Sequence, residues 1–291
     1  MQFSILAHQL IHGLGLIIFL KMEDKKLSII GGGNLGGSIA EGIANSQLVK
    51  PENITVTRRK TEKLTSLAEQ GIQVHSDNHK AVENANIVLL AIKPKQIRAV
   101  LEEINTVVNQ GNKILISVVT GVSLQNMASV VGSHVTLFRA MPNTAIAIRE
   151  SMTCIATNNA TEEQKEMVKA IFDTVGRTVY IEENLMAAST VLGACGIAYA
   201  MRFIRAASQG GIEIGFNSEI AQLIAAQTVR GASTLLLERG QHPEREIDKV
   251  TTPQGCTIAG INEMEHQGFS SALIKGILTS FNKIDDIAED F

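Results

Sequence analysis

A glycine-rich stretch near the start of the chain constrains the fold more than any other feature. The apolar run Leu27–Ile30 stops at glycines, and apolar residues at helical spacing follow from Leu35. Between the expected strand and helix, Gly31, Gly33 and Gly36 form the pattern G-x-G-x-x-G. In this context the glycines allow a tight turn, close approach of a pyrophosphate, and close packing of helix on strand. The stretch therefore predicts a dinucleotide site at a helix N-terminus, with a ligand-free glycine turn as the alternative.

Strand and helix patterns alternate from this stretch to Ile181. A capping box at Thr161 and Gln164 opens one of the expected helices. Apolar runs that alternate with helices imply a mainly parallel sheet covered on both faces, so we expect an α/β domain of the Rossmann type over residues 27–182. The expected strands span residues 27–30, 53–57, 72–74, 87–92, 113–119, 135–140, 151–156 and 178–181, and the expected helices 34–44, 60–70, 79–84, 97–108 and 161–174.

The end of the second expected strand indicates which dinucleotide binds. NAD-specific sites usually carry an acidic residue there, bonded to the ribose 2′-OH. Here Thr57 is followed by Arg58, Arg59 and Lys60, without a carboxylate. Guanidinium groups bind a phosphate through a fork of N–H donors. The sequence therefore favours NADPH, with NADH as the second cofactor, and a solvated basic turn as the alternative.

The remainder of the chain, residues 183–291, reads as long helices. Residues 185–207 are apolar around nearly the whole helix, residues 218–237 are apolar on more than one face, and breaks are expected at 210–211, 215, 240–243 and 268. A helix that is apolar all round must be buried. Because this half is too small to bury two such helices, we expect an obligate interface in a homodimer or larger homo-oligomer. A compact bundle packed on the nucleotide domain is the alternative.

Composition excludes several classes of partner. The net charge is -3, Trp is absent and only two Tyr occur, so we expect no nucleic-acid surface. The three cysteines are widely spaced, which argues against a disulfide framework or a metal site and fits the cytoplasm. Residues 1–26 read as an N-terminal extension, disordered or helical, with a membrane anchor as the alternative. Its apolar part, 10–20, is too short to span a bilayer and lacks the basic start of a signal peptide.

Motifs in different parts of the chain carry a more specific resemblance. The stretches IIGGGNLGGSIAEGI, AIKP, MPNT and TPQGCTIAG occur in this order. From about Lys26 to Ile287 the chain resembles the pyrroline-5-carboxylate reductases. That resemblance implies a dinucleotide-binding domain followed by a helical dimerisation domain. It also implies reduction of 1-pyrroline-5-carboxylate to L-proline, the last step of proline biosynthesis, with NADPH generally preferred.

The resemblance further implies positions for both ligands. The cofactor residues that the resemblance implies are Gly31, Gly33, Asn34, Leu35, Gly36, Thr57, Asn78, Ala91, Ile92, Lys93, Pro94, Val118, Val119 and Thr120. The end of the second strand, discussed above, adds Arg58 and Arg59 to this set. The expected substrate residues are Asn143, Thr252, Gly255, Cys256 and Thr257, with catalytic roles for Thr257 and Glu183. From the residues alone, Asn78 and Asn143 could equally be turn residues. The loop before Thr257 reads either as a carboxylate cradle or as a plain N-cap formed by Thr257.

Departures from the family pattern fall near these positions. The family's Ser-Gly-Ser-Gly-Pro-Ala is replaced by Gly193–Ala198, with the sequence GACGIA. Gln254 and Cys256 replace a glycine and a small residue, and Val119 and Thr120 replace alanines. These changes keep two alternatives open. One is a reductase of another cyclic imine or of a carbonyl acid, and the other is a weakly catalytic, NADP-binding regulatory dimer.

Overall fold

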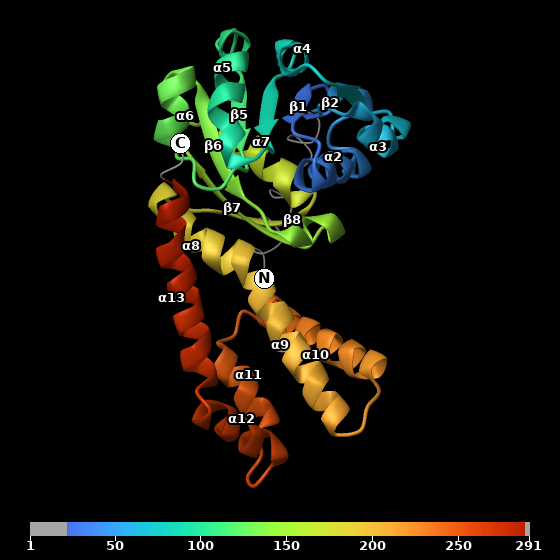
Figure 1. The fold of residues 1–291 in the computed structure, drawn as a ribbon, viewed down its shortest axis with the longest axis vertical. Coiled ribbons are helices and arrows are strands. Elements are labelled where there is room, and N and C mark those ends of the chain that lie inside the picture. Colours follow the sequence, from blue (N-terminus) through green and yellow to red (C-terminus); the bar gives the residue numbers. More distant parts are fainter. Residues whose placement is uncertain (1–21, 289–291) are drawn as a thin grey trace, which may run out of the picture. The chain divides into compact units, whose positions relative to one another are not determined.

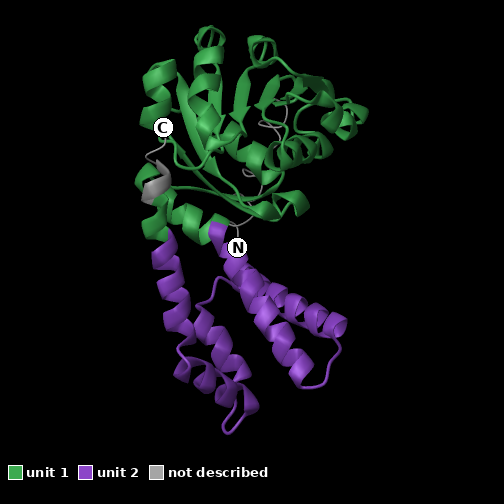
Figure 2. Cartoon of the chain, in the orientation of Figure 1, with its two compact units in different colours: residues 1–194, 281–291 green, residues 195–280 purple. Residues whose placement is uncertain are grey.

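The computed structural model describes residues 22–288, which divide into two compact units (Figure 2). The first comprises residues up to Ala194 together with those from Phe281, and the second is Cys195–Ser280. The first unit thus runs past residue 182, because the start of the helical region packs on the sheet. Met186 is buried there in a small cluster with Met141 and Ala156.

The first unit is built on one eight-stranded sheet with the order β3-β2-β1-β4-β5-β6-β7-β8 (Figure 1). All neighbouring pairs are parallel except β6 and β7, so the predicted α/β class with a mainly parallel sheet is confirmed. The strands are β1 (Leu27–Ile30), β2 (Ile54–Thr57), β3 (Gln73–His75), β4 (Ile87–Leu90), β5 (Ile114–Ser117), β6 (Thr136–Met141), β7 (Ser151–Thr157) and β8 (Gly176–Tyr180).

The antiparallel pair follows from the short connection between its strands. Only residues 142–150, which include the 3₁₀ turn η4 (Thr144–Ile148), join β6 to β7. A parallel pair would need a crossover of a dozen residues or more, so a link of this length forces the chain to reverse. The sheet therefore changes direction beside the MPNT motif.

Helices cover both faces of the sheet, as predicted. Alternate residues of the central strands point to opposite faces, and they fall into two separate buried clusters: Leu89 packs with α2 and α7, whereas Leu90 packs with α5 and α6. The α-helices of the first unit before residue 183 are α2 (Asn34–Ser46), α3 (Thr65–Glu69), α4 (Asn78–Glu83), α5 (Ile97–Val108), α6 (Leu124–Val131) and α7 (Glu162–Asp173).

One expected helix differs from the structure, one observed helix was not predicted, and one predicted helix cap is confirmed. The helix expected over residues 60–70 is a 3₁₀ turn, η2 (Thr61–Leu64), followed by the short α3. Helix α6 was not predicted, although Ser123 caps it by accepting a hydrogen bond from the Asn126 N–H. The capping box of α7 is present in both directions.

The expected N-terminal extension lies mostly outside the described residues, which begin at Met22. Met22 itself is fully buried in the cluster shared with α2 and α7. The Lys26 N–H donates to the Asn86 side chain, and the Lys26 carbonyl accepts from the Asn86 N–H. Residues 22–26 are therefore part of the folded unit.

The helical region begins at Glu183 and crosses from the first unit to the second. It comprises η5 (Glu183–Leu185), α8 (Met186–Ser189), the π-helical segment η6 (Thr190–Cys195), α9 (Gly196–Glu213), α10 (Ser218–Arg239), α11 (Pro243–Val250), α12 (Cys256–His266) and α13 (Phe269–Ala288). The expected break at residues 210–211 is wrong, because α9 continues to Glu213. Instead, Gly211 lets α10 approach closely, since a Cβ there would lie 3.0 Å from the Ala221 methyl group.

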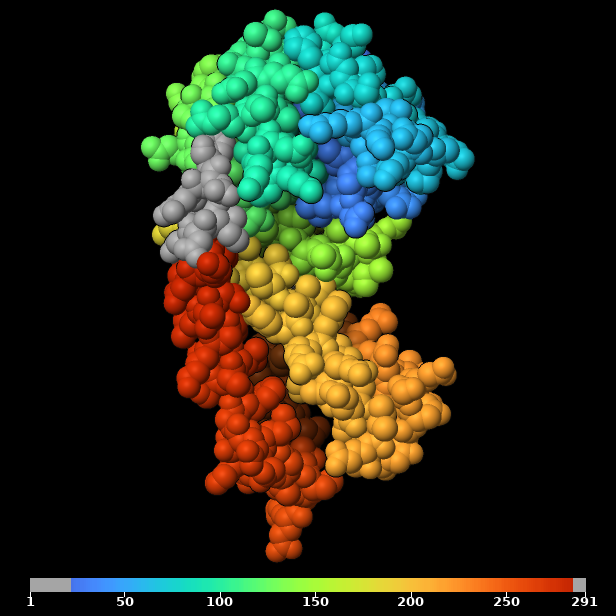
Figure 3. Space-filling view, viewed as in Figure 1, coloured from blue at the N-terminus to red at the C-terminus, as the bar shows by residue number. Residues whose placement is uncertain are grey.

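The second unit leaves many large apolar side chains exposed. Only Ser208, Ala221 and Ala225 are buried between residues 195 and 280. By contrast, side chains such as Ile214 and Leu223 are mostly exposed. The helices that carry these side chains are coloured yellow to red in the space-filling view (Figure 3). The apolar faces predicted from sequence are thus present and uncovered.

Candidate dinucleotide site and substrate loop

The glycine loop between β1 and α2 is held by the last residue of β2. The N–H groups of Gly31 and Gly32 donate to the Thr57 carbonyl at 3.2 and 2.7 Å, and Gly33 N–H donates to the Gly31 carbonyl at 2.9 Å. Gly31 has φ +106°, in the region that favours glycine. The turn is therefore fixed by backbone hydrogen bonds within the protein itself.

The three motif glycines differ in what surrounds them. A Cβ at Gly31 would overlap the Ala91 carbonyl, and one at Gly36 would overlap the Gly31 carbonyl. At Gly33, in contrast, nothing lies within 4 Å. Gly33 is also the N-cap of α2 and makes no side-chain capping bond, which leaves the first N–H groups of the helix uncapped. An open backbone beside a helix N-terminus fits the pyrophosphate of a dinucleotide.

The end of β2 brings three predicted cofactor residues to this loop. Thr57 is 2% exposed, and its hydroxyl donates to the Asn78 Oδ1 at 2.7 Å. Arg58 donates from Nη1 to the Gly32 carbonyl at 2.8 Å. Arg59, the next residue, is exposed. The glycine loop, the buried Thr57 hydroxyl and the Arg58 guanidinium therefore meet at the carboxyl end of β2, and Arg59 follows directly in the chain.

The other predicted cofactor segments follow the neighbouring strands at the same edge. The Ala91 N–H donates to the Ile30 carbonyl at 2.8 Å, and the Val118 N–H to the Leu90 carbonyl at 3.0 Å. Residues 91–94 and 118–120 thus leave the carboxyl ends of β4 and β5. Val118 and Val119 are buried. In open α/β sheets, ligands bind in the crevice outside these strand ends.

Glu183 makes two hydrogen bonds within the first unit. Its Oε1 accepts from the Arg139 Nη1 at 2.9 Å and from the Leu124 N–H at 2.7 Å. Leu124 is the first residue of α6, so the carboxylate lies at the positive end of that helix. Arg139 is on β6 and is mostly buried. Glu183 therefore links the start of α6 to β6. Helix α6 begins shortly after residues 118–120, which leave the end of β5.

The Asn143 amide also has both of its ends bonded. Its Oδ1 accepts from the Ala145 N–H at 3.0 Å, and its Nδ2 donates to the Gly193 carbonyl at 3.2 Å. Gly193 lies in the π-helical segment η6, which carries part of the changed GACGIA sequence. Asn143 thus links the turn after β6 to this segment.

The predicted substrate loop leads into α12 in the second unit. Gly255 is the N-cap and makes no side-chain capping bond, and its N–H donates to the Thr252 carbonyl at 2.9 Å. The alternative that Thr257 is the N-cap is wrong, because α12 begins at Cys256. Among the described residues the Thr257 hydroxyl has no hydrogen-bond partner. Gln254 adopts φ +59°, a conformation that suits the glycine of the family pattern better.

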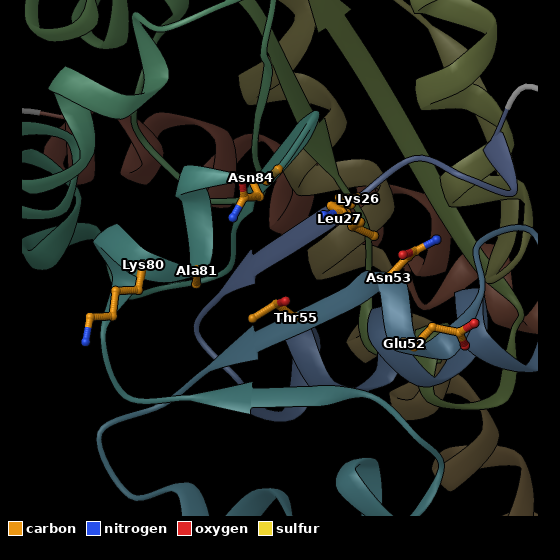
Figure 4. A pocket seen from close by; sticks show the side chains of 9 residues that line it. Lys26, Leu27, Glu52, Asn53, Thr55, Lys80, Ala81 and Asn84 are labelled. Carbon is orange, nitrogen blue, oxygen red and sulfur yellow. The ribbon is translucent and has the colours of Figure 1, made fainter.

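A separate cavity of about 190 Å³ lies at the opposite edge of the sheet (Figure 4). It is lined by residues at the amino ends of β1 and β2 and on α4, including Lys26, Thr55 and Lys80. None of the predicted site residues lines it. Over residues 22–284, whose side chains the structure describes, no group of three or more His, Cys, Asp and Glu side chains is arranged to hold a metal ion.

One helical stretch among the described residues, Glu183–Glu213, is long and apolar enough to cross a membrane. Length and composition alone are weak evidence, because a subunit interface meets the same criterion. Arg202 and Arg205 lie within the stretch and are exposed.

Comparisons with known families match both halves of the chain. The family described as "Pyrroline-5-carboxylate reductase dimerisation" matches residues 183–287. The family described as "NADP oxidoreductase coenzyme F420-dependent" matches residues 26–121. The helical half is therefore a dimerisation domain, and the chain associates with itself.

Solved structures of pyrroline-5-carboxylate reductases have similar folds. A Plasmodium falciparum pyrroline carboxylate reductase with NADP bound has a TM-score of 0.82 at 26% identity, covering 92% of this chain and 99% of that one. A pyrroline-5-carboxylate reductase from Coxiella burnetii has a TM-score of 0.86 at 28% identity, covering 91% and 98%.

Curated relatives extend the match at the sequence level. Pyrroline-5-carboxylate reductase 1 of Dictyostelium discoideum is 46% identical over 91% of this chain, which spans 50% of that relative. Pyrroline-5-carboxylate reductase 2 of the same organism is 44% identical over 90% of this chain and 92% of the relative. With that identity along nearly the whole of a relative, and with the glycine cradle and the uncapped substrate loop both present, the chain belongs to the pyrroline-5-carboxylate reductase family.

Proposed function

We propose that this protein uses NADPH to reduce 1-pyrroline-5-carboxylate to L-proline. The observation that carries the proposal is the 44% identity to a reductase of this name over 92% of its length. The open backbone at Gly33, at the N-terminus of α2, supports the dinucleotide part of the proposal. NADH serves as the second cofactor.

When bound, NADPH supplies a hydride from its nicotinamide to the imine carbon. The uncapped N–H groups of α2 hold the pyrophosphate, with Asn34 and Leu35 in the first turn. Arg59 binds the 2′-phosphate, since it is exposed and no acidic residue follows β2. Residues 91–94 and 118–120 form the wall beside the nicotinamide.

The substrate loop has a separate task. The Gly255 N–H is bonded to the Thr252 carbonyl, so the N–H groups of Cys256 and Thr257, in the first turn of α12, would hold the substrate carboxylate beside the Thr252 hydroxyl. The Thr257 hydroxyl would hydrogen-bond the ring nitrogen of the substrate, where negative charge is gained on reduction of the C=N bond. Because a protonated imine is already electrophilic, the main work of the protein is to hold donor and acceptor in reactive geometry.

Glu183 and Asn143 act by positioning. Glu183 fixes the N-terminus of α6 and, with it, the loop that leaves β5. Asn143 fixes the turn of the MPNT motif against Gly193. Neither side chain needs to touch the reacting atoms to affect the rate, because small displacements of a reactive pair are costly.

We further propose that the apolar faces of α9 and α10 are covered by a second copy of the chain and not by lipid or nucleic acid. Arg202 and Arg205 support this, because charged side chains in the middle of a membrane span are costly. The net charge of -3 offers no basis for binding nucleic acid. The cytoplasm is the compartment that suits three free cysteines.

NADPH oxidation measured against a panel of cyclic imines and keto acids tests the proposal. We expect the highest kcat/KM with 1-pyrroline-5-carboxylate. A clear preference for another imine or a carbonyl acid would show that the protein is a reductase of a different substrate. The altered Gly193–Ala198 segment supports that alternative. Dinucleotide binding without turnover of any compound would favour a regulatory dimer.

Thr257→Ala tests the role of the substrate loop. Loss of a hydrogen bond to the ring nitrogen should lower kcat/KM at least tenfold, which corresponds to about 1.4 kcal/mol. The melting temperature and the Kd for NADPH should stay unchanged, because Gly255 and not Thr257 caps α12. Thr279→Ala removes an exposed threonine hydroxyl from α13 and serves as the control. Unchanged kcat/KM in Thr257→Ala would contradict the assignment.

A further inference from the structure

A short chain of hydrogen bonds leads from the glycine loop to a carboxylate on α5. Thr57, whose carbonyl holds the loop, donates from its hydroxyl to the Asn78 Oδ1 at 2.7 Å. Asn78, the first residue of α4, donates from Nδ2 to the Glu103 Oε2 at 3.1 Å. Glu103 lies on the exposed side of α5. Three elements, β2, α4 and α5, are thus joined through one amide.

The carboxylate determines the direction of this chain. An ionised carboxylate can only accept hydrogen bonds, whereas a hydroxyl can donate or accept. If the Asn78 amide turned over, its oxygen would face the Glu103 oxygens, with no hydrogen between them. Thr57 alone would tolerate either orientation. Glu103 is therefore the member that selects the observed one.

The selected orientation matters for what Asn78 offers to a ligand. One hydrogen of its NH₂ group is bonded to Glu103, and among the described residues the other has no partner. Asn78 follows β3, which pairs with β2 so that Thr57 lies opposite His75. In sheets of this topology the ribose of a dinucleotide lies at the end of the second strand. Asn78 therefore presents a donor, and ribose or phosphate oxygens are acceptors.

We propose that Glu103 is a positioning residue for the dinucleotide, acting through Asn78. It holds the amide so that a donor, not an acceptor, is available beside the glycine loop. The proposal rests on the dinucleotide site of the proposed function. It adds a residue on α5, a helix that supplies none of the expected cofactor contacts.

The test compares NADPH affinity, measured by the fluorescence of NADPH itself or by calorimetry, in a set of variants of the full chain. Glu103→Ala should raise the Kd about fivefold, the size expected for one oriented hydrogen bond. Glu103→Gln can accept or donate a hydrogen bond, so it does not fix the Asn78 amide in one orientation and should restore only part of the affinity. Glu102→Ala is the matched control, because Glu102 is the neighbouring exposed carboxylate on the same helix. It should leave the Kd unchanged.

Asn78→Ala supplies the decisive background. If Glu103 acts only through Asn78, adding Glu103→Ala to Asn78→Ala should cause no further loss of affinity. An equal loss in both backgrounds would overturn the proposal, as would a Kd for Glu103→Ala that matches Glu102→Ala. A lower melting temperature without a change in Kd would also overturn it, by assigning Glu103 to stability alone. Failure of the proposed function is distinguishable, since the wild-type chain would then not bind NADPH or not turn over the imine.

Discussion

The two units of this chain use apolar residues in opposite ways. In the nucleotide-binding unit, large side chains such as Ile39, Phe138 and Phe172 are completely buried within the unit. In the helical unit, Leu223 is 69% exposed and Leu237 is 61% exposed. Both sequences are rich in apolar residues, yet only the first builds a core of its own. The second leaves its large apolar side chains on the surface, in the region that matches a dimerisation family.

The apolar side chains that the helical unit leaves in water do not contribute to its stability. Burying a leucine side chain is worth about 1.5–3 kcal/mol, and the helices of the second unit forgo this at many positions. Isolated helices gain most of their stability from packing of an apolar face. The fold of the helical unit is therefore coupled to self-association, whereas the sheet unit is stabilised from within.

The largest expected effect is the loss of self-association in the variant Leu223→Asp. The change removes a leucine from α10 and introduces a carboxylate, and in a two-fold dimer it does so twice. At ~2 kcal/mol per copy, the dimer Kd should rise roughly a thousand-fold. Sedimentation velocity should detect dissociation at micromolar concentration, accompanied by loss of helical signal in circular dichroism.

Thr106→Asp is the control for this experiment, because Thr106 is exposed on α5 of the sheet unit. It introduces the same charge on a surface helix and should leave the dimer intact. A Leu223→Asp chain that stays dimeric at low concentration, with an unchanged melting temperature, would show that α10 does not contribute to the interface.

The next effect separates folding from ligand binding within the sheet unit. Gly33→Ala should fold normally, because nothing lies within 4 Å of the added methyl group. That methyl group would occupy the space that a pyrophosphate needs. At ~2 kcal/mol, the cost of inserting a methyl group into a close contact, NADPH affinity should fall about 30-fold. Calorimetry and thermal melting measure the two properties separately.

Gly37→Ala is the matched control for Gly33→Ala. Gly37 also has open space around it but lies inside α2, where alanine is favoured over glycine by up to about 1 kcal/mol. It should raise stability and leave the Kd for NADPH within about twofold. If both variants lose affinity equally, the open space at Gly33 is not the pyrophosphate site.

A smaller effect distinguishes the two arginines after β2. Arg58 bonds the Gly32 carbonyl, so Arg58→Ala should weaken NADPH and NADH alike by disturbing the glycine loop. Arg59 is exposed, and Arg59→Ala should weaken NADPH about tenfold relative to NADH, the lower end for a bond to a charged group. Fluorescence titration of both cofactors checks this. A loss of equal size for the two cofactors in Arg59→Ala would remove Arg59 from the 2′-phosphate.

Much of the sheet unit could be predicted from its sequence, because its signals are local. The glycine motif, the apolar strand runs and the Thr161 capping box each act over a few residues, and α5 spans the predicted residues 97–108. The uncovered apolar faces of the helical unit were predictable for the same reason. They follow from two helices that are apolar on more than one face, in a helical half too small to bury them.

The contacts that join distant residues could not be predicted in this way. Glu183 bonds Arg139, far away in the sequence, and Asn143 bonds Gly193, and no pattern announces either pair. Continuation of α9 through Gly211 depends on the approach of α10, which is a tertiary contact. The start of α12 is fixed at Cys256 by the loop before it, so the role of Thr257 as a cap was mistaken. Beyond the glycine motif and the two arginines after β2, the positions of the ligand-binding residues came from family resemblance, and they stay predictions that the experiments above test.

The smallest expected effect is a pH dependence confined to the sheet unit. Asp77 caps α4 by accepting a hydrogen bond from the Lys80 N–H, and this bond lowers the pKa of its carboxyl group. A folded-state pKa below the unfolded value means that the ionised form stabilises the protein above the unfolded pKa, about 3.9. That contribution is lost as the pH falls through the folded-state pKa. Asp77→Asn keeps a capping oxygen but cannot ionise. The melting temperature of the wild type should therefore exceed that of Asp77→Asn by about 2 °C or less near pH 7, and the difference should shrink as the pH falls below about 3.9. A gap that stays constant across this range would mean that the cap does not depend on the charge of Asp77.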